Sequence, residues 1–575
     1  MKRTSSIINK KYNEYLIPTV LTAMATQLTA FVDSVISSNF VCPDAIAAIS
    51  LVSPIQQFVF SLTVFFGLGS SALISTAQGS GDKQKANRIF TVSFVAILIV
   101  SALLMLIQLP FADSICALFT KDAELLALTH DFYVPFVIGT PFYLILFCAI
   151  HGIRIDGRPR FSSLIMIVAN VINLILDYLF MAVLDMGIAG AAWATVIGNI
   201  VGLIMVATHY FSGRSSLRLD FKESSPKKLS PVLKELFSTG LSGAMGTLLI
   251  VVRLQFFISI ITIIAGSQGL LAFSLCTSVS RLISMFITGA SQAMIPIVAL
   301  CMGERDYQGV RFAFRRAATV LAWASGIMLL YFMALPDTFI DIFGITDSAD
   351  RAASRTALII NAFTIPGQAF LFLLLYYFMA TGRKLIATTI SIVFGVAVLP
   401  LGYIMSVPWG INGIWWSMVL VNFIGLIIVW VMALRIKKRE NMGDLYLIPS
   451  SDDSELTSIS IEASPANAST ASVFIQNFLD SHSIEKGKAT KVALAIEELI
   501  ANIAEINKEK INLDIRITVS GDDVITSIRD NGKPCNPKVE LNDMPRTTSL
   551  TVLCSIAKEI DYSQLLGFNR TLITI

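Results

Sequence analysis

The sequence predicts a mainly α-helical, polytopic membrane protein with twelve transmembrane helices in two six-helix lobes, followed by a small cytoplasmic α/β domain. Composition is the first support. Of the 575 residues, 54% are hydrophobic and only 14% are charged, and the mean hydropathy is +0.71. Soluble proteins carry about 25% charged residues. Long apolar runs therefore place the chain in the membrane class.

An internal repeat is the second support. Residues 187–199 read GIAGAAWATVIGN, and residues 410–422 read GINGIWWSMVLVN. Other landmarks recur at nearly the same spacing: Leu109-Pro110 as Leu335-Pro336, Asp122 as Asp347, Pro141 as Pro366, Gly157-Arg158 as Gly382-Arg383, and Gly81-Asp82-Lys83 as Gly303-Glu304-Arg305. Two homologous membrane halves with a site between them are a common transporter design.

Each half contains six apolar segments of the length that a bilayer requires, about 20 residues. In the first half we expect spans at 15–38, 48–78, 89–109, 131–153, 161–184 and 188–211. In the second half we expect them at 237–263, 270–300, 316–335, 356–381, 385–406 and 411–434. The two lobes are then residues 1–220 and 221–440.

Basic residues in the connecting segments support this count, because they concentrate on the cytoplasmic side. The N-terminus, alternate loops and the segment after the last span carry 26 Lys and Arg residues, whereas the intervening loops carry 3, which are Lys121, Arg351 and Arg355. Both termini are therefore predicted to be cytoplasmic, in a multi-pass protein of the cell membrane. Six spans in each half make the repeats parallel rather than inverted.

The composition changes after Arg439. Residues 441–470 are predicted to form a linker or leading strand, and residues 471–575 a soluble domain. The segment 488–506 has helical periodicity, and the strand patterns NLDIRITVS and VITSIRD are separated by a hairpin turn. We expect a helix at 550–560 and a last strand at NRTLITI.

Two carboxylates lie well inside spans, Asp33 in the first and Asp177 in the fifth, at a similar depth toward the outer side. Asn170, Asn173 and Asp177 share one helix face. This set suits a proton or a hard cation. Burial raises the pKa of a carboxylate, so that it can be protonated, whereas a bound Na⁺ favours the ionised form. The alternative is a helix-packing hydrogen bond or a water-facing side chain. Charges at membrane depth are expensive, which favours function.

The second half instead carries deep basic residues, Arg253 and Arg281. They either face an anionic or zwitterionic substrate or bond structurally to carbonyl or carboxylate oxygens. Gln57 and Gln255 join Asn170, Arg253 and Arg281 as candidates for lining a substrate cavity, although amides also join helices. The seven cysteines form no CxxC pair, so neither a metal site nor a disulfide framework is predicted.

With these motifs, residues 10–435 resemble the MATE (multidrug and toxic compound extrusion) family. The resemblance rests on the Gly81-Asp82 loop, the pair Asn173 and Asp177, and the span opening at Gly187. It implies a V-shaped exporter with a central cavity, driven by H⁺ or Na⁺ antiport of amphipathic, often cationic, drugs. It also implies that Asp33, Asn173 and Asp177 form the first-lobe cation site. The second-lobe acidic residue of some Na⁺-coupled members is not evident here, where Arg253 occupies that neighbourhood.

The C-terminal domain resembles the GHKL ATPase fold, nearest to anti-sigma-factor serine kinases. The resemblance gives Glu498 the role of activating water or a hydroxyl group and Asn502 that of holding Mg²⁺. It gives Asp530 and Gly532 the adenine-binding role. The family's glycine-rich lid is missing from MPRTTSLTVL, where Ser549 stands near the expected glycine. Because glycine permits close backbone approach to phosphate, we expect weak or lost binding of ATP and Mg²⁺, and no enzymatic role for the membrane part.

Three functions remain open from the sequence. The leading one is a secondary active exporter of amphipathic small molecules that uses H⁺ or Na⁺ and no other cofactor. The second is a flippase of a lipid-linked or anionic substrate, in which Arg253 and Arg281 bind the headgroup. The third is a membrane sensor whose tail binds nucleotide or a cytoplasmic regulatory protein. The expected partners are the substrate and the lipid bilayer, and no nucleic acid.

Overall fold

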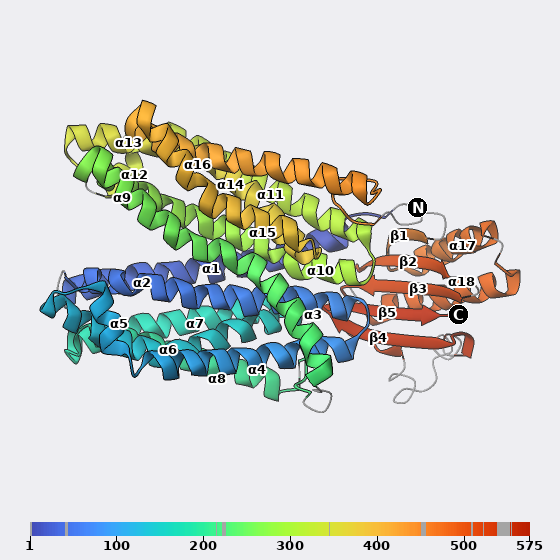
Figure 1. Cartoon of the computed structure of the whole chain (residues 1–575). Coiled ribbons are helices and arrows are strands. Elements are labelled where there is room, and N and C mark those ends of the chain that lie inside the picture. Colours follow the sequence, from blue (N-terminus) through green and yellow to red (C-terminus); the bar gives the residue numbers. More distant parts are fainter. Residues whose placement is uncertain are drawn as a thin grey trace.

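The computed structural model describes residues 3–40, 44–213, 215–220, 226–343, 345–449, 456–482, 484–507, 510–520, 523–537, 553 and 555–575. Within these ranges, the side chains of residues 26–40, 44–47, 226–229, 267 and 520 are not described. Two helical bundles make up most of the molecule, and a β-sheet domain lies at one end of both (Figure 1).

The first bundle contains six membrane-length rods, several of them built from consecutive helices. Its elements are α1 (Ser6–Phe40), α2 (Asp44–Thr63), η1 (Val64–Leu68), α3 (Gly69–Gly79), α4 (Lys83–Gln108), α5 (Ala112–Phe119), α6 (Ala123–Ile155), α7 (Pro159–Asp177), η2 (Tyr178–Val183) and α8 (Gly187–Phe211). The η segments are π-helical turns that continue a rod. The short α5 is a connection between two rods.

The second bundle repeats this layout, with α12 in the place of α5. Its elements are α9 (Pro226–Ala293), α10 (Ile295–Gly303), α11 (Tyr307–Ala334), α12 (Asp337–Ile342), α13 (Ser348–Ala362), α14 (Thr364–Ala380), α15 (Lys384–Ile392), η3 (Val393–Ala397) and α16 (Val398–Arg439). Both α9 and α16 hold two rods, because the backbone turns at Gly266 (φ 56°) and at Gly410 (φ 55°). Such positive φ values cost glycine little.

Within the described residues the helices form twelve rods, as predicted. Among the described residues, ten helical stretches are long and apolar enough to cross a membrane, and the last, Lys384–Arg439, contains the break at Gly410. The 35 residues of α1 also exceed the length of a span. Most rods extend several residues beyond the expected limits, because helices continue past the apolar segment into polar ends.

The backbone confirms the repeat at several turns and corrects one equivalence. Gly157 and Gly382 have φ values of 79° and 75°, and Gly187 and Gly410 have 62° and 55°. The predicted match of Gly81-Asp82-Lys83 with Gly303-Glu304-Arg305 is wrong by two residues. The Asp82 carboxylate caps α4 and the Asp306 carboxylate caps α11, so these two aspartates are equivalent. The chemical similarity of the two tripeptides conceals the shift.

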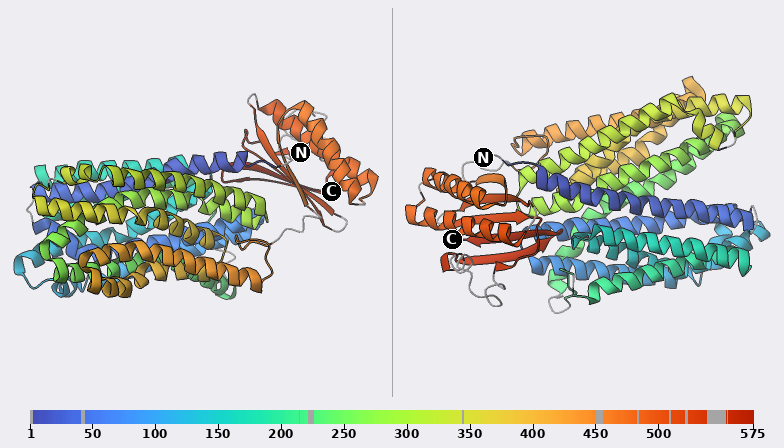
Figure 2. Two further views of the ribbon diagram at one scale, coloured as in Figure 1. Left: turned by 90° about the horizontal axis from the view of Figure 1, so that it is seen from above. Right: turned by 180° about the vertical axis from the view of Figure 1, so that it is seen from behind.

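The two bundles touch at the end that faces the β-sheet domain and diverge toward the opposite end (Figures 1 and 2). At the domain-facing end α3 packs against α10, the equivalent helix of the other bundle. A Cβ atom on Gly79 would lie 2.2 Å from the carbonyl oxygen of Leu300, and one on Gly303 would lie 2.0 Å from that of Thr76. The absence of side chains at these two glycines therefore sets how closely the bundles approach.

The C-terminal domain is a five-stranded antiparallel sheet with strand order β1-β2-β3-β5-β4. Its elements are β1 (Leu456–Glu462), α17 (Pro465–Ser481), α18 (Lys486–Ile506), β2 (Asn512–Ser520), β3 (Asp523–Asp530), β4 (Glu559–Leu565) and β5 (Phe568–Thr574). Both helices cover one face of the sheet, where a separate apolar core forms. The other face looks toward the bundles (Figure 2).

Two boundaries in this region differ from the prediction. Residues 441–470, predicted as a linker or leading strand, do contain a leading strand, β1, because the alternating residues of LTSISIE bury Ile459 and Ile461 in the sheet core; they also contain the start of α17, so the domain begins before residue 471. The expected helix at 550–560 ends early, and β4 begins at Glu559. Charged and polar residues conceal the period of β4, since only one of its faces is apolar. Residues 550–552 and 554 lie outside the described residues.

We predict that Gly303→Ala weakens the contact between the bundles. The added methyl group collides with the Thr76 carbonyl, and overpacking of this kind costs about 1–3 kcal/mol. The purified protein should therefore unfold several degrees below wild type in a thermal scan. Gly326→Ala is the matched control, because a Cβ at that helical position meets nothing within 4 Å and alanine favours helix over glycine. Equal unfolding temperatures for the two variants would contradict the tight contact.

Candidate functional site

The predicted cation site lies inside the first bundle, on the face of α7 that packs against α1 and α8. Asn173 and Asp177 are one turn apart on this helix, and both are buried. The Asn173 amide donates a hydrogen bond to Oγ1 of Thr195 on α8, at 3.1 Å. A Cβ on Gly198 would lie 3.2 Å from that of Asn173, so α8 approaches closely here. The helix packing thus encloses the two predicted polar residues.

Asn170 and Asp33 belong to the same region. Asn170 is half-buried, and its amide donates to the Met166 carbonyl at 2.8 Å, within the helix. Asp33 lies on α1, which packs along α7, but its side chain is outside the description. The structure therefore places the backbone of α1 beside the site and leaves the geometry of the Asp33 carboxylate as a prediction.

A change of helix type occurs at the candidate carboxylate. Asp177 ends α7, and the π-helical turn η2 begins at Tyr178. Such turns insert a residue into a helix and are frequent at functional sites, because they re-aim side chains and free backbone groups. Sequence periodicity did not reveal η2, since a single π-turn shifts the apolar stripe by only one residue. The π-turn is therefore a second feature, besides the burial of Asp177, that is typical of a functional site.

The residues predicted to line a substrate cavity differ in exposure, and their shared cavity stays a prediction. Arg253 is half-buried on α9, and its guanidinium carbon lies 4.4 Å from the centre of the Phe394 ring on η3. Gln255 and Arg281 are exposed on the same helix, and Gln57 is half-buried on α2. Within the described residues, no hydrogen bond joins Arg253 to Gln255. Arg253 is the more buried of the two candidate arginines.

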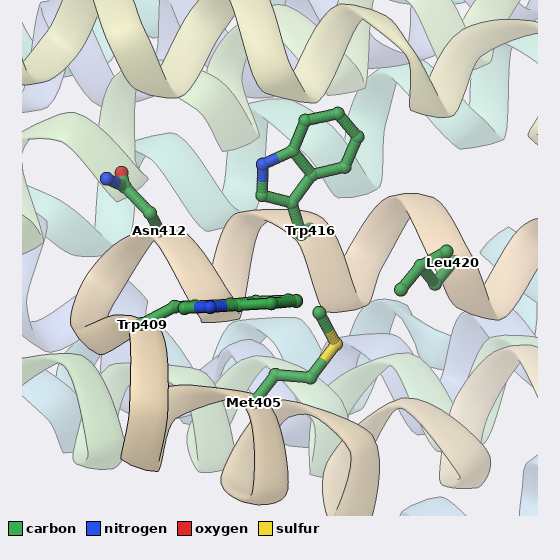
Figure 3. A pocket seen from close by; sticks show the side chains of 5 residues that line it. All are labelled: Met405, Trp409, Asn412, Trp416 and Leu420. Carbon is green, nitrogen blue, oxygen red and sulfur yellow. The ribbon is translucent and has the colours of Figure 1, made fainter.

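A cavity of about 480 Å³ lies elsewhere, at the turn between the last two rods. Figure 3 shows the side chains of Met405, Trp409, Asn412, Trp416 and Leu420 around it, all from α16. Trp416 also stacks on Phe363, with ring centres 6.0 Å apart. Because Trp is enriched where a helix meets the membrane interface, this pocket fits an interfacial position rather than the predicted central site.

The candidate nucleotide residues of the C-terminal domain lie on neighbouring elements. Glu498 and Asn502 are one turn apart on α18, and Asp530 ends β3. The thiol of Cys535 donates to the Asn502 side-chain oxygen at 3.2 Å. The predicted role of Asn502 in holding Mg²⁺ stays a prediction. Among the described residues, no group of three or more His, Cys, Asp and Glu could hold a metal.

Asp530 bonds to a residue that the sequence analysis missed. Its Oδ1 accepts hydrogen bonds from the Gly532 amide and from Nδ2 of Asn569, both at 2.8 Å. Asn569 also donates to the carbonyls of Gly532 and Lys533. Burial raises the pKa of Asp530, which its two hydrogen bonds partly oppose. The sequence signal for this partner was Asn569 itself, a polar residue at an inward-facing position of the last strand. The lid segment around Ser549 lies outside the described residues.

Comparison with known proteins agrees with this architecture. The family model MatE matches residues 18–179 and 244–404, which is more than half of the chain. The model of the histidine kinase-like ATPase domain matches residues 461–561. Multidrug export protein MepA of Staphylococcus aureus is 23% identical over 65% of this chain and 82% of its own length. The MepA of Staphylococcus haemolyticus is 25% identical over 68% of this chain and 86% of its own length.

Solved structures of transporters share the fold of the bundles. An outward-facing multidrug resistance MATE family transporter superposes with a TM-score of 0.71 at 20% identity, over 76% of this chain and 97% of its own. A MOP superfamily transporter from Pyrococcus furiosus, described as having a binding pocket of reverse polarity, gives 0.69 at 20% identity, over 74% and 97%. This protein therefore belongs to the MatE family of multi-pass membrane transporters and carries a histidine kinase-like ATPase domain at its C-terminal end.

Proposed function

We propose that this protein exports amphipathic small molecules from the cell by antiport with H⁺ or Na⁺, and that Asp33, Asn173 and Asp177 bind the coupling ion. The burial of Asp177 inside a membrane-length helix carries the proposal. A carboxylate at that depth is costly and marks ion pathways in transporters. A bound proton or cation neutralises it, and the relatives named above are multidrug export proteins.

The proposed orientation places both termini and the C-terminal domain in the cytoplasm. The loops at the domain-facing end carry the excess of Lys and Arg, as cytoplasmic loops do. The diverging ends of the bundles then face outward. Export requires the opposite state as well, in which the domain-facing end opens to admit substrate. The contact at Gly79 and Gly303 must therefore separate during each cycle.

A specific observation favours a second candidate function, the movement of an anionic or lipid-linked substrate. Arg253 faces the Phe394 ring inside the second bundle, and within the described residues no carboxylate lies in ion-pair range of it. An unneutralised guanidinium group in a membrane bundle suits a phosphate or carboxylate, because its planar donors match the oxygens of such groups. Arg281 is exposed and supports this reading less.

We predict that Asp177→Asn abolishes gradient-driven export, because a neutral amide takes up no proton in this pH range and holds a cation less strongly than a carboxylate does. The measurement is dye accumulation in efflux-deficient bacteria, with and without a protonophore and with Na⁺ varied. Efflux should fall at least tenfold, close to the level of cells without the protein. Asp185→Asn is the matched control, since Asp185 is an exposed carboxylate just beyond the same rod. Full efflux by Asp177→Asn at equal membrane abundance would contradict the assignment.

The sensitivity of the wild type identifies the ion. Efflux that stops with the protonophore at every Na⁺ concentration indicates H⁺. Efflux that follows Na⁺ and survives the protonophore indicates Na⁺.

Arg253→Gln separates the two candidate substrates. If the cargo is anionic, the variant should lose at least tenfold in transport of an anionic fluorescent lipid or dye in proteoliposomes, because the cation that pairs with the substrate is gone. If the cargo is cationic, transport of a cationic dye should be unchanged or faster. Arg281→Gln serves as the comparison, since it removes an equal charge from an exposed position.

For the C-terminal domain we propose a regulatory role without ATP turnover. The Asn569 amide already bonds to the Asp530 carboxylate that an adenine amino group would need. An adenine ligand would have to break the bond between Asn569 and Asp530, which weakens its binding, since a hydrogen bond to a charged group contributes about 1.5–3 kcal/mol. The absence of glycine from 544–553 removes the flexible backbone that would wrap the phosphates.

Calorimetry on the full chain in detergent should therefore show no micromolar binding of Mg-ATP. Asn569→Ala frees the carboxylate and should leave binding weak, since the lid is still absent. Micromolar binding by wild type that is lost in Asp530→Ala would show that the site is functional and that our reading of the lid is wrong.

A further inference from the structure

The C-terminal domain presents an unusual charged surface to the bundles. In the register of the sheet, Arg529 on β3 lies directly opposite Arg570 on β5, and Asp514 on β2 lies opposite Arg529. Like charges in directly opposed positions destabilise a sheet. Both arginine side chains are nevertheless buried. The middle of this face therefore places two adjacent arginines beside one directly opposed carboxylate, Asp514, while Asp561 lies on the outer strand β4 of the same face.

The second bundle adds two carboxylates that pair with these arginines. The turn between α10 and α11 carries Glu304 and Asp306, both buried. Arg529 pairs with Glu304 and lies 3.3 Å from Oδ2 of Asp306, and Nε of Arg570 is 3.7 Å from Oε1 of Glu304.

The same turn is held by two further arginines. Nη2 of Arg516 donates to the Glu304 backbone carbonyl at 2.5 Å. Arg3, from the N-terminal segment, pairs with Asp306 and with Asp514. Burial alone would raise the pKa of Asp306, but Arg3 and Arg529 hold it well below its usual range.

The same domain also binds the first bundle. Nη1 of Arg570 donates to the carbonyl oxygen of Gly79, at 3.1 Å. Gly79 and Gly303 are the equivalent glycines at which the bundles touch, and Glu304 follows Gly303 directly. One side chain of the C-terminal domain thus contacts α3 of one bundle and the α10–α11 turn of the other. Separation of the bundles must break at least one of these contacts.

The β4–β5 hairpin strengthens this bridge. Its tip residues Leu565, Leu566 and Phe568 are buried in the main apolar core of the bundles rather than in the core of their own domain. A Cβ on Gly157, at the α6–α7 turn of the first bundle, would lie 2.2 Å from the Gly567 amide nitrogen. The ammonium group of Lys11 lies 4.7 Å from the centre of the Phe568 ring. The tip is therefore fitted against the first bundle.

We propose that the C-terminal domain is an intramolecular latch that holds the two bundles together at the domain-facing end. The surface of the latch is the face of the sheet that carries Arg516, Arg529 and Arg570, with the tip of the hairpin. Its partner is the Gly79 and Glu304–Asp306 region of the same chain. The latch must release for this end to open. Its effect on transport rests on the proposed export function, whereas the closure itself does not.

A native thiol reports on the closure. Cys301 on α10 is buried, and its backbone carbonyl accepts from the Asp306 amide at 2.7 Å. A water-soluble maleimide reacts with an exposed thiolate and spares a buried thiol. The experiment measures the labelling rate of Cys301 by peptide mass spectrometry, on the full chain in lipid nanodiscs. Cys276 and Cys148, away from the latch, are internal references for global unfolding.

Glu304→Gln and Arg570→Gln should each speed the labelling of Cys301 by about tenfold or more, because each leaves buried charge uncompensated. The rates at Cys276 and Cys148 should not change. Arg305→Gln is the control, since Arg305 is an exposed arginine in the same turn. If Arg570→Gln does not fold, the labelling rate of Glu304→Gln tests the latch, because this variant leaves the C-terminal domain unaltered. Wild-type labelling of Cys301 in a folded Glu304→Gln protein would overturn the latch, as would equally fast labelling in Arg305→Gln.

A second measurement fixes the latch in place. Lys83 of the first bundle and Asp561 of β4 form an exposed ion pair at 3.4 Å, so cysteines at both positions can be joined by a short reducible crosslinker. Joining them should stop dye transport, and reduction should restore it, while either single cysteine variant transports normally. Undiminished transport by the crosslinked protein would refute the need for release. If no form transports but Cys301 labelling still depends on Glu304, the export function fails and the latch stands.

Discussion

The contact between the two bundles at Gly79 and Gly303 is the constraint on which the rest of the arrangement depends. Because neither residue has a side chain, the backbones of α3 and α10 approach to distances that a methyl group would prevent. This approach brings the Gly79 carbonyl and the Glu304 carboxylate within reach of one arginine. A wider separation would break one of the two contacts of Arg570, either with the Gly79 carbonyl or with the Glu304 carboxylate.

The internal repeat creates this contact, but the two halves carry different residues next to it. Ser80 and Glu304 occupy equivalent positions at the ends of α3 and α10. The Ser80 hydroxyl bonds to its own helix, whereas Glu304 reaches the C-terminal domain. The first bundle accordingly offers a backbone carbonyl to the latch, and the second offers two carboxylates. The two equivalent turns therefore form an asymmetric docking surface.

Much of the membrane fold was predictable, because the signals are strong and local. Apolar runs, the repeat and the alternation of basic loops defined twelve rods, and the family match confirms the class. The burial of Asn173 and Asp177 was predictable for the same reason, since a polar residue in an apolar span points inward. The π-turn η2 and the interfacial pocket on α16 were not, because they depend on small backbone shifts that leave no periodic trace.

The latch was not predictable from sequence patterns. Its charges are scattered over Arg3, Glu304, Asp306, Arg529 and Arg570, and each looks like an ordinary solvated residue at a turn or on a strand. Only the strand register places Arg529 opposite Arg570, and only the docking of the domain puts Glu304 beside them. Similarly, the predicted helix 550–560 runs two residues into β4, and β4 itself was not predicted, because most of its residues are polar and the apolar residues of its hairpin tip are buried in another domain's core.

The register of β3 and β5 also connects the two faces of the C-terminal domain. Arg529 pairs with Arg570, and the next residues along the strands, Asp530 and Asn569, pair with each other. Since successive side chains point to opposite faces of a sheet, the first pair looks toward the bundles and the second toward the helices. A ligand that took the Asn569 amide away from Asp530 would act one residue from the arginines of the latch. The nucleotide-type site and the proposed latch therefore share one pair of strands.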